Sequence, residues 1–225
     1  MYYIILLPAI IFALIAQVMV KSTFKKYSTV SNQHGYTAAE VARRILDDNG
    51  LNYISIEHIS GELTDHFDPT ANVIRLSDAV YGSTSVAAIG VAAHEVGHAI
   101  QHAEGYAPIR VRQAIIPVTQ IGSKLAVPLI LVGMIISALD FLIPLGIFLY
   151  AGVVFFQAVT LPVEFNASGR ALRTLDENLI LYKDEVGQAK KVLSAAAMTY
   201  VAAMFSAIMS LLRLILIANG GRRRR

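Results

Sequence analysis

Residues 125–163 read LAVPLILVGMIISALDFLIPLGIFLYAGVVFFQAVTLPV, and this stretch decides the fold because it contains one charged residue, Asp140. A helix needs about 20 mostly apolar residues to cross the hydrocarbon core of a bilayer. The stretch is 39 residues long, so it predicts two transmembrane helices. The tight turn between these helices is expected near Asp140 and Pro144.

Two further uncharged stretches continue this pattern. YYIILLPAIIFALIAQVMV (residues 2–20) and VLSAAAMTYVAAMFSAIMSLL (residues 192–212) are each long enough for one span. The first stretch lacks a basic n-region and a small-x-small pattern before Lys21, which favours an uncleaved anchor over a signal peptide. The chain is only 16% charged, against about 25% in a typical soluble protein. We therefore predict a mainly α integral membrane protein with about four transmembrane helices.

The basic residues predict which side of the membrane the polar segments occupy. With four spans, residues 21–124 and 164–191 share one side and hold fourteen Lys and Arg residues, against five on the other side. Short cytoplasmic segments are enriched in Lys and Arg. We therefore expect a multi-pass protein of the cell membrane whose polar segment 21–112 faces the cytoplasm, although the arginine tail argues for the opposite orientation.

Composition also limits the partners. The net charge of +3 is carried by the terminal RRRR, and a basic tail beside a span is typical of contact with lipid headgroups. The sequence has no basic patch interleaved with aromatic residues, so nucleic acid is not an expected partner. The absence of cysteine excludes disulfides and cysteine-ligated metal.

The polar segment 21–112 has the signals of a small α+β domain. Thr37 and Glu40 have the spacing of a capping box and predict a helix over 35–50, and serines before residue 86 predict a second helix over 86–104. A glycine ends each of these helices. NYISIEHIS and ANVIRLS flank the turn-rich GELTDHFDPT, which predicts a short β-hairpin with a wide loop.

The helix predicted over 86–104 carries the motif HEVGH, residues 94–98. Residues four apart lie on one face of a helix, so His94 and His98 can both direct a ring nitrogen at one metal ion. Zinc lowers the pKa of a bound water to about 7, and a carboxylate alongside can take its proton. Glu95 lies on a different face from His94, which suits a general base. The motif therefore predicts two zinc ligands and a catalytic base.

A catalytic zinc site needs a third protein ligand. The metzincin pattern requires a glycine and a third histidine at the positions of Gln101 and Glu104, so this class is excluded. An intramembrane site-2-type protease would use an aspartate from a later span. Asp140 is the only candidate for that role, and we keep this as an alternative.

A glutamate from a separate helix is the other source of a third ligand. Glu104 lies on the motif helix itself, on an unsuitable face, and Glu177 lies in the polar LDENL. Glu164 lies in LPVEFNASGRAL, between apolar residues, where a lone carboxylate is costly unless it is paired or binds metal. Glu164 is therefore the preferred ligand, and a salt bridge to Arg170 or a helix cap is the alternative role.

Three segments carry a resemblance to known proteins: LTDHFDPTANVIRLS, AAHEVGHAIQH and LPVEFNASGRAL. Together with the order of spans, they resemble the YugP-type family of bacterial neutral zinc metallopeptidases, related to membrane-bound gluzincins of the HtpX and CAAX prenyl protease kind. The resemblance covers most of residues 21–200. It implies a small gluzincin-like domain that binds one zinc ion through His94, His98 and Glu164, with Glu95 as the base.

One position departs from the HtpX-like pattern. That pattern places an aspartate four residues after the third ligand, and this chain has Ser168 there. Such a carboxylate orients a ligand histidine and raises its basicity, so another acid, such as Asp68 or Asp176, is a candidate to replace it. The candidates for contact with a ligand or for stabilising an oxyanion are His102, Tyr106, Asn166, Ser168 and Arg170.

The predicted function is a zinc-dependent endopeptidase that acts on membrane or unfolded proteins. Substrate would pair as an extra strand with an edge strand formed by Asn72, Val73, Ile74 and Arg75. The alternative from another class is a non-catalytic membrane scaffold or adaptor stabilised by zinc. The predicted order along the chain is an anchor (1–20), the metallopeptidase segment (21–112), a two-span hairpin (125–163), a polar helix with the third ligand (164–191), a last span (192–218) and a basic tail (219–225).

Overall fold

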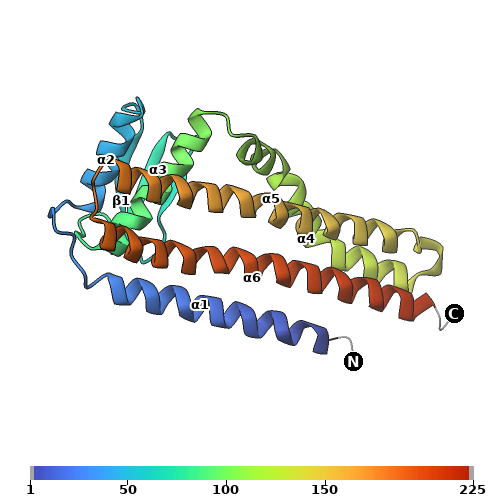
Figure 1. Ribbon diagram of the computed structural model, residues 1–225. Helices are drawn as coiled ribbons and strands as arrows, with labels where there is room; N and C mark the ends of the chain where they lie inside the picture. Colours follow the sequence, from blue (N-terminus) through green and yellow to red (C-terminus); the bar gives the residue numbers. More distant parts are fainter. Residues whose placement is uncertain (1–2, 223–225) are drawn as a thin grey trace. The chain divides into compact units, whose positions relative to one another are not determined.

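The computed structural model of the protein describes residues 3–222, most of which are helical (Figure 1). The long helices are α1 (Leu7–Tyr27), α4 (Ala107–Ile135), α5 (Leu142–Glu177) and α6 (Lys183–Arg222). Two shorter helices are α2 (Ala38–Asp48) and α3 (Val86–Ala103), and short 3-10 turns cover Ile4–Leu6 and Ser137–Leu139. The strands in this part of the chain are β1 (Ser55–Ile59), β2 (His66–Asp68) and β3 (Val73–Ser77).

Among residues 3–222, four helical segments are long and apolar enough to cross a bilayer. They are Ile4–Tyr27, Ala107–Ile135, Leu142–Glu177 and Lys183–Gly220. The predicted mainly α membrane protein with four spans and a small α+β part is therefore confirmed.

The chain divides into two compact units. The first, which we call the helical unit, consists of Met1–Gln17, Pro108–Pro162 and Met198–Arg225, and is described here between residues 3 and 222. Within it, α4 and α5 approach closely at glycines. A Cβ at Gly146 would lie 2.6 Å from the carbonyl oxygen of Ala126. Small residues that let helix backbones meet are typical of helix packing in membranes.

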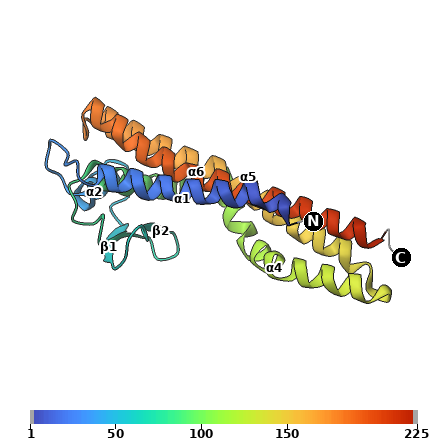
Figure 2. The ribbon, with the colours of Figure 1, turned by 90° about the horizontal axis from the view of Figure 1, so that it is seen from below.

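The second unit, which we call the site unit, consists of Val18–Ala107 and Val163–Ala197. Its core is formed by buried apolar residues of α2, α3 and β3 together with the parts of α5 and α6 that belong to this unit. α2 packs against α3 and β1 (Figure 1 and Figure 2). The predicted caps of both short helices are confirmed: Thr37 and Glu40 form a capping box, and Ser85 caps α3.

The strand order corrects the predicted hairpin. The sheet has the order β1-β3-β2, with β1 parallel and β2 antiparallel to β3. The two predicted strands are therefore parallel neighbours, and β3 forms its hairpin with β2, a strand that the sequence suggested was loop. β3 is the central strand, with four of its five residues buried. The prediction that Asn72, Val73, Ile74 and Arg75 form an edge is wrong, because β3 pairs on both sides and Asn72 lies in the preceding turn.

The helix boundaries also differ from the prediction around the third candidate ligand. The expected polar helix over 164–191 is divided: residues 164–177 continue α5, and residues 183–191 begin α6. The turn between them is held by the buried Glu185, whose carboxylate accepts hydrogen bonds from the N–H groups of Tyr182 and Gln33. The predicted turn at Asp140 lies between α4 and α5 as expected. Of the basic tail, residues 223–225 lie outside the described residues.

Candidate metal centre

Three side chains predicted as ligands converge in the site unit. His94 and His98 point from one face of α3, and Glu164 points from α5. The Glu164 Oε2 atom lies 3.3 Å from His94 Nε2 and 3.4 Å from His98 Nε2. Within residues 3–222, these residues form the one group of three or more His, Asp or Glu side chains whose ligand atoms all lie within 4.8 Å of one another.

The close approach of α3 and α5 depends on a glycine. A Cβ at Gly97 would lie 2.7 Å from the carbonyl oxygen of Ala167, which is far inside van der Waals contact. Gly97 stands between His94 and His98 in the motif, and Ala167 follows Glu164 by three residues. The absence of a side chain at Gly97 therefore lets the carboxylate reach both imidazoles.

Gly97→Ala is expected to push α5 away from α3, because the obstacle is backbone rather than a flexible side chain. We expect a loss of metal affinity and a destabilisation of about 1–3 kcal/mol, as overpacking typically causes. Metal content after dialysis and thermal unfolding measure the two effects. Gly90→Ala is the matched control on the same helix, since its Cβ would meet Ala189 Cβ at an ordinary 3.4 Å. Equal metal binding by both variants would contradict this account.

The chemistry of the cluster suits zinc. Glu164 is only 2% exposed, and a carboxylate so deeply buried needs a cationic or hydrogen-bonding partner. Two imidazole nitrogens and one carboxylate oxygen are a donor set that zinc accepts in catalytic sites, where a fourth position stays open. Burial disfavours the charged form of His98, but Glu164 and the nearby Glu95 outweigh this effect and raise the pKa of His98. The two carboxylates therefore favour a positive charge at the imidazoles, which a bound metal ion would also supply.

Glu95, the predicted base, lies between α3 and the sheet. It is 9% exposed, and its Oε2 atom accepts a hydrogen bond from the N–H of Phe67 at 3.0 Å. The Phe67 ring also contacts the ring of His102, at 5.9 Å between centroids. Phe67 is the middle residue of β2, opposite Ile74 of β3. Because its N–H points to Glu95, the unpaired edge of β2 faces the predicted base.

One of the predicted contacts, Ser168, lies beside a ligand histidine, and two others lie farther out. Ser168 Oγ is 3.1 Å from His94 Nδ1, so the serine occupies the position expected of an orienting group. Asn166 accepts a hydrogen bond from Arg170 at 2.8 Å, and Arg170 forms an ion pair with Glu104 at 2.7 Å. The alternative in which Arg170 pairs with Glu164 is therefore not what the structure shows.

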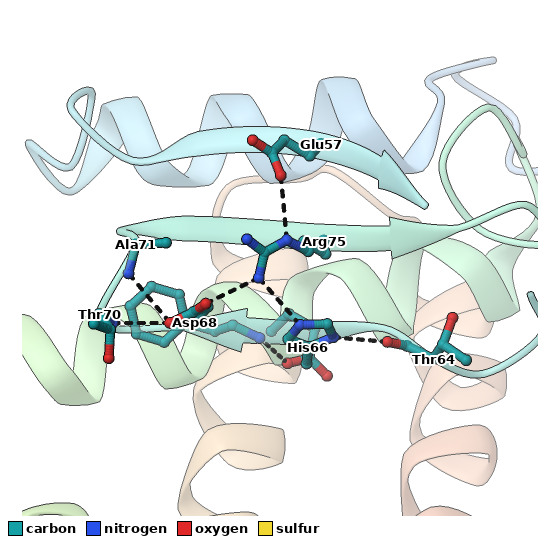
Figure 3. A network of polar contacts seen from close by, with 9 residues as sticks. Glu57, Thr64, His66, Asp68, Thr70, Ala71 and Arg75 are labelled. Atoms are coloured by element: carbon teal, nitrogen blue, oxygen red, sulfur yellow. Dashed lines mark hydrogen bonds and ion pairs between the residues drawn. The ribbon is translucent and has the colours of Figure 1, made fainter. Parts of the chain in front are cut away.

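Other candidates are placed elsewhere. Tyr106 lies in the turn after α3, where its N–H donates to the carbonyl of Gln101. Arg75 forms ion pairs across the sheet with Asp68 and Glu57, at 2.9 and 3.2 Å (Figure 3). The Arg75 hydrogen bond holds the pKa of Asp68 below its usual range, so this acid is engaged in the sheet. Asp176 and Glu177 are exposed, and Asp140 does not belong to the ligand cluster.

Sequence reasoning missed one contact of the cluster, Gln101. This residue is fully buried, and its Oε1 atom lies 3.0 Å from His98 Nδ1. Its Nε2 atom donates to the Val163 carbonyl and to Asn166 Oδ1. The one signal in the sequence is its spacing, because residues three apart on a helix are neighbours.

Comparison with known proteins finds one matching family and one curated relative, both described as proteases. Residues 2–219 match a family model described as "Putative neutral zinc metallopeptidase". The chain is 50% identical over 207 residues to "Putative membrane protease YugP" of Bacillus subtilis (strain 168), and the alignment covers 92% of each chain. No solved structure matches the chain.

Proposed function

The chain belongs to this family of neutral zinc metallopeptidases, and from that premise we propose that it is a membrane-embedded zinc endopeptidase. The observation that carries the proposal is the convergence of His94, His98 and Glu164 next to Glu95. The expected substrates are peptide segments of membrane proteins or of unfolded proteins. The polar, catalytic segment is proposed to face the cytoplasm.

The three ligands would hold one zinc ion, which supplies a Lewis acid and an acidified water. Glu95 would accept a proton from the attacking water and deliver it to the leaving amine nitrogen. Its hydrogen bond to Phe67 keeps the carboxylate close to β2. Ser168 and Gln101 lie against the outer nitrogens of the two ligand histidines and would keep the rings in place.

The open edge of β2 supports a revised position for the substrate. Among the described residues, β3 is paired on both sides and β2 on one side only, and Phe67 directs its N–H toward Glu95. An extended peptide could add to β2 through main-chain hydrogen bonds, which would bring its scissile bond near the base. We propose that β2, in place of the strand expected at 72–77, receives the substrate.

In the rival function, a non-catalytic scaffold, the same ligands would bind zinc only to stabilise the fold. Structural zinc sites are usually closed by four protein ligands, whereas this cluster has three. A structural zinc site also needs no general base, whereas Glu95 lies where a peptidase would need one. The number of ligands and the position of Glu95 therefore favour the enzyme.

Chelation tests the proposed function directly. Purified protein in detergent is expected to contain about one zinc ion and to cleave a fluorescently labelled unfolded protein. A zinc chelator should abolish cleavage, and added zinc should restore it, while a non-chelating isomer of the same compound should have no effect. Zinc-loaded, folded protein that cleaves neither unfolded proteins nor membrane-derived peptides would favour the scaffold.

A further inference from the structure

We propose that Gln101 is a positioning residue that keeps a proton on His98 Nδ1 and thereby leaves His98 Nε2 free to bind metal. The inference rests on the proposed function, because it assumes that His98 is a ligand. Gln101 is buried, lies outside the HEVGH motif and is not itself a ligand.

The orientation of the Gln101 amide follows from its surroundings. One of its terminal atoms lies 2.8 Å from the Val163 carbonyl and 2.9 Å from Asn166 Oδ1. A backbone carbonyl can only accept, so this atom must be the NH2 group, and both of its hydrogens are used. The oxygen of the amide is therefore the atom that lies 3.0 Å from His98 Nδ1.

Arg170 fixes the orientation of the Asn166 amide in the same way. Its Nε donates to Asn166 Oδ1 at 2.8 Å, and a guanidinium has no acceptor. Asn166 must therefore present its oxygen to both Arg170 and Gln101. Glu104 holds the guanidinium in place through the ion pair at 2.7 Å. The direction of the hydrogen bonds is thus set from Arg170 through Asn166 to Gln101.

The amide oxygen of Gln101 can only accept, so His98 Nδ1 must carry the proton. Glu164 Oε2 lies 3.4 Å from His98 Nε2. The carboxylate therefore favours a proton on Nε2, the nitrogen that would otherwise bind the metal. Without Gln101, a neutral His98 would donate from Nε2 to Glu164, and two of the three ligands would be bonded to each other. Gln101 opposes that arrangement.

His94 lacks an equivalent constraint from its neighbour. Its Nδ1 atom lies 3.1 Å from Ser168 Oγ, and a hydroxyl can either donate or accept. The two histidines therefore differ, since the partner of His98 dictates the position of the proton and the partner of His94 does not. Gln101 also contacts the Val163 carbonyl, which directly precedes Glu164, so one side chain positions both a ligand ring and the helix turn that carries the third ligand.

The test is Gln101→Met, which fills a similar volume but can neither accept from His98 nor donate to α5. The zinc dissociation constant, measured by competition with a chromophoric chelator, is expected to rise 10- to 100-fold, as for loss of other groups that orient a ligand. Gln188→Met is the matched control, because Gln188 is a half-buried glutamine of α6 whose Oε1 makes no hydrogen bond within the described chain. Unchanged zinc affinity in folded Gln101→Met would overturn the proposal.

A spectroscopic measurement distinguishes positioning from simple packing. In protein with 15N-labelled histidine, the proton on His98 Nδ1 is expected as a slowly exchanging resonance, with or without zinc. Gln101→Met should shift or lose this resonance and leave that of His94 unchanged. Absence of the Nδ1 proton in the wild-type protein would overturn the proposal even if the variant did not fold. Normal zinc binding and a normal resonance without peptidase activity would count against the proposed function alone.

Discussion

Glu95→Gln is expected to abolish peptide cleavage and to leave zinc bound. Glutamine has nearly the same shape, and its side-chain oxygen can still accept the hydrogen bond from the Phe67 N–H. It cannot take a proton from water, however, and general acid–base catalysis typically contributes about 10²–10⁴-fold to the rate. Cleavage rate and zinc content measured on the same preparation separate the two effects.

Glu177→Gln is the control for this experiment, because Glu177 is an exposed glutamate at the end of α5. It should cleave like the wild-type protein. If Glu95→Gln retained the wild-type rate with its zinc in place, Glu95 would not be the base. The peptidase mechanism would then have to be abandoned.

Glu164→Ala is expected to lose zinc. The variant keeps His94 and His98 but removes the ligand from α5, so two imidazoles remain. Loss of a group that hydrogen-bonds to a metal ligand typically lowers metal affinity about 10- to 100-fold. We expect loss of the ligand itself to lower the zinc affinity by more than this. Because zinc that binds only the folded state stabilises it, the wild-type protein should melt at a higher temperature with zinc, and the variant should not.

Glu177→Ala tests whether any carboxylate of α5 has this effect, and it should retain the zinc-dependent stabilisation. Glu164→Gln gives a second comparison, since it preserves the side-chain volume and lacks the charge. A Glu164→Ala protein that bound zinc as tightly as the wild type would show that another residue completes the site.

The spans and the ligand candidates could be predicted because their signals are local. The apolar run at 125–163 and the spacing of His94 and His98 need no knowledge of the rest of the fold. Glu164 is a candidate for a similar reason, since a carboxylate between apolar residues needs a partner. The structure places it 3.3 Å from His94 Nε2.

The sheet and Gln101 depend on contacts that the sequence does not display. β2 has three residues within a stretch rich in turn formers, and a strand this short has little periodicity to recognise. Its pairing with β3, and the parallel pairing of β1, are set by the packing of the unit. Gln101 bonds to Val163 and Asn166, which lie 62 and 65 residues away, so its role becomes visible only when α3 and α5 are placed together.

The crossing at Gly97 also limits how this centre can be altered. Most steric conflicts between helices can be relieved by a second substitution that shortens the opposing side chain. Here the opposing atom is the carbonyl oxygen of Ala167, which every amino acid carries. No suppressor mutation at residue 167 can therefore restore the fit, and engineered versions of this centre must conserve the glycine or rebuild the path of a whole helix.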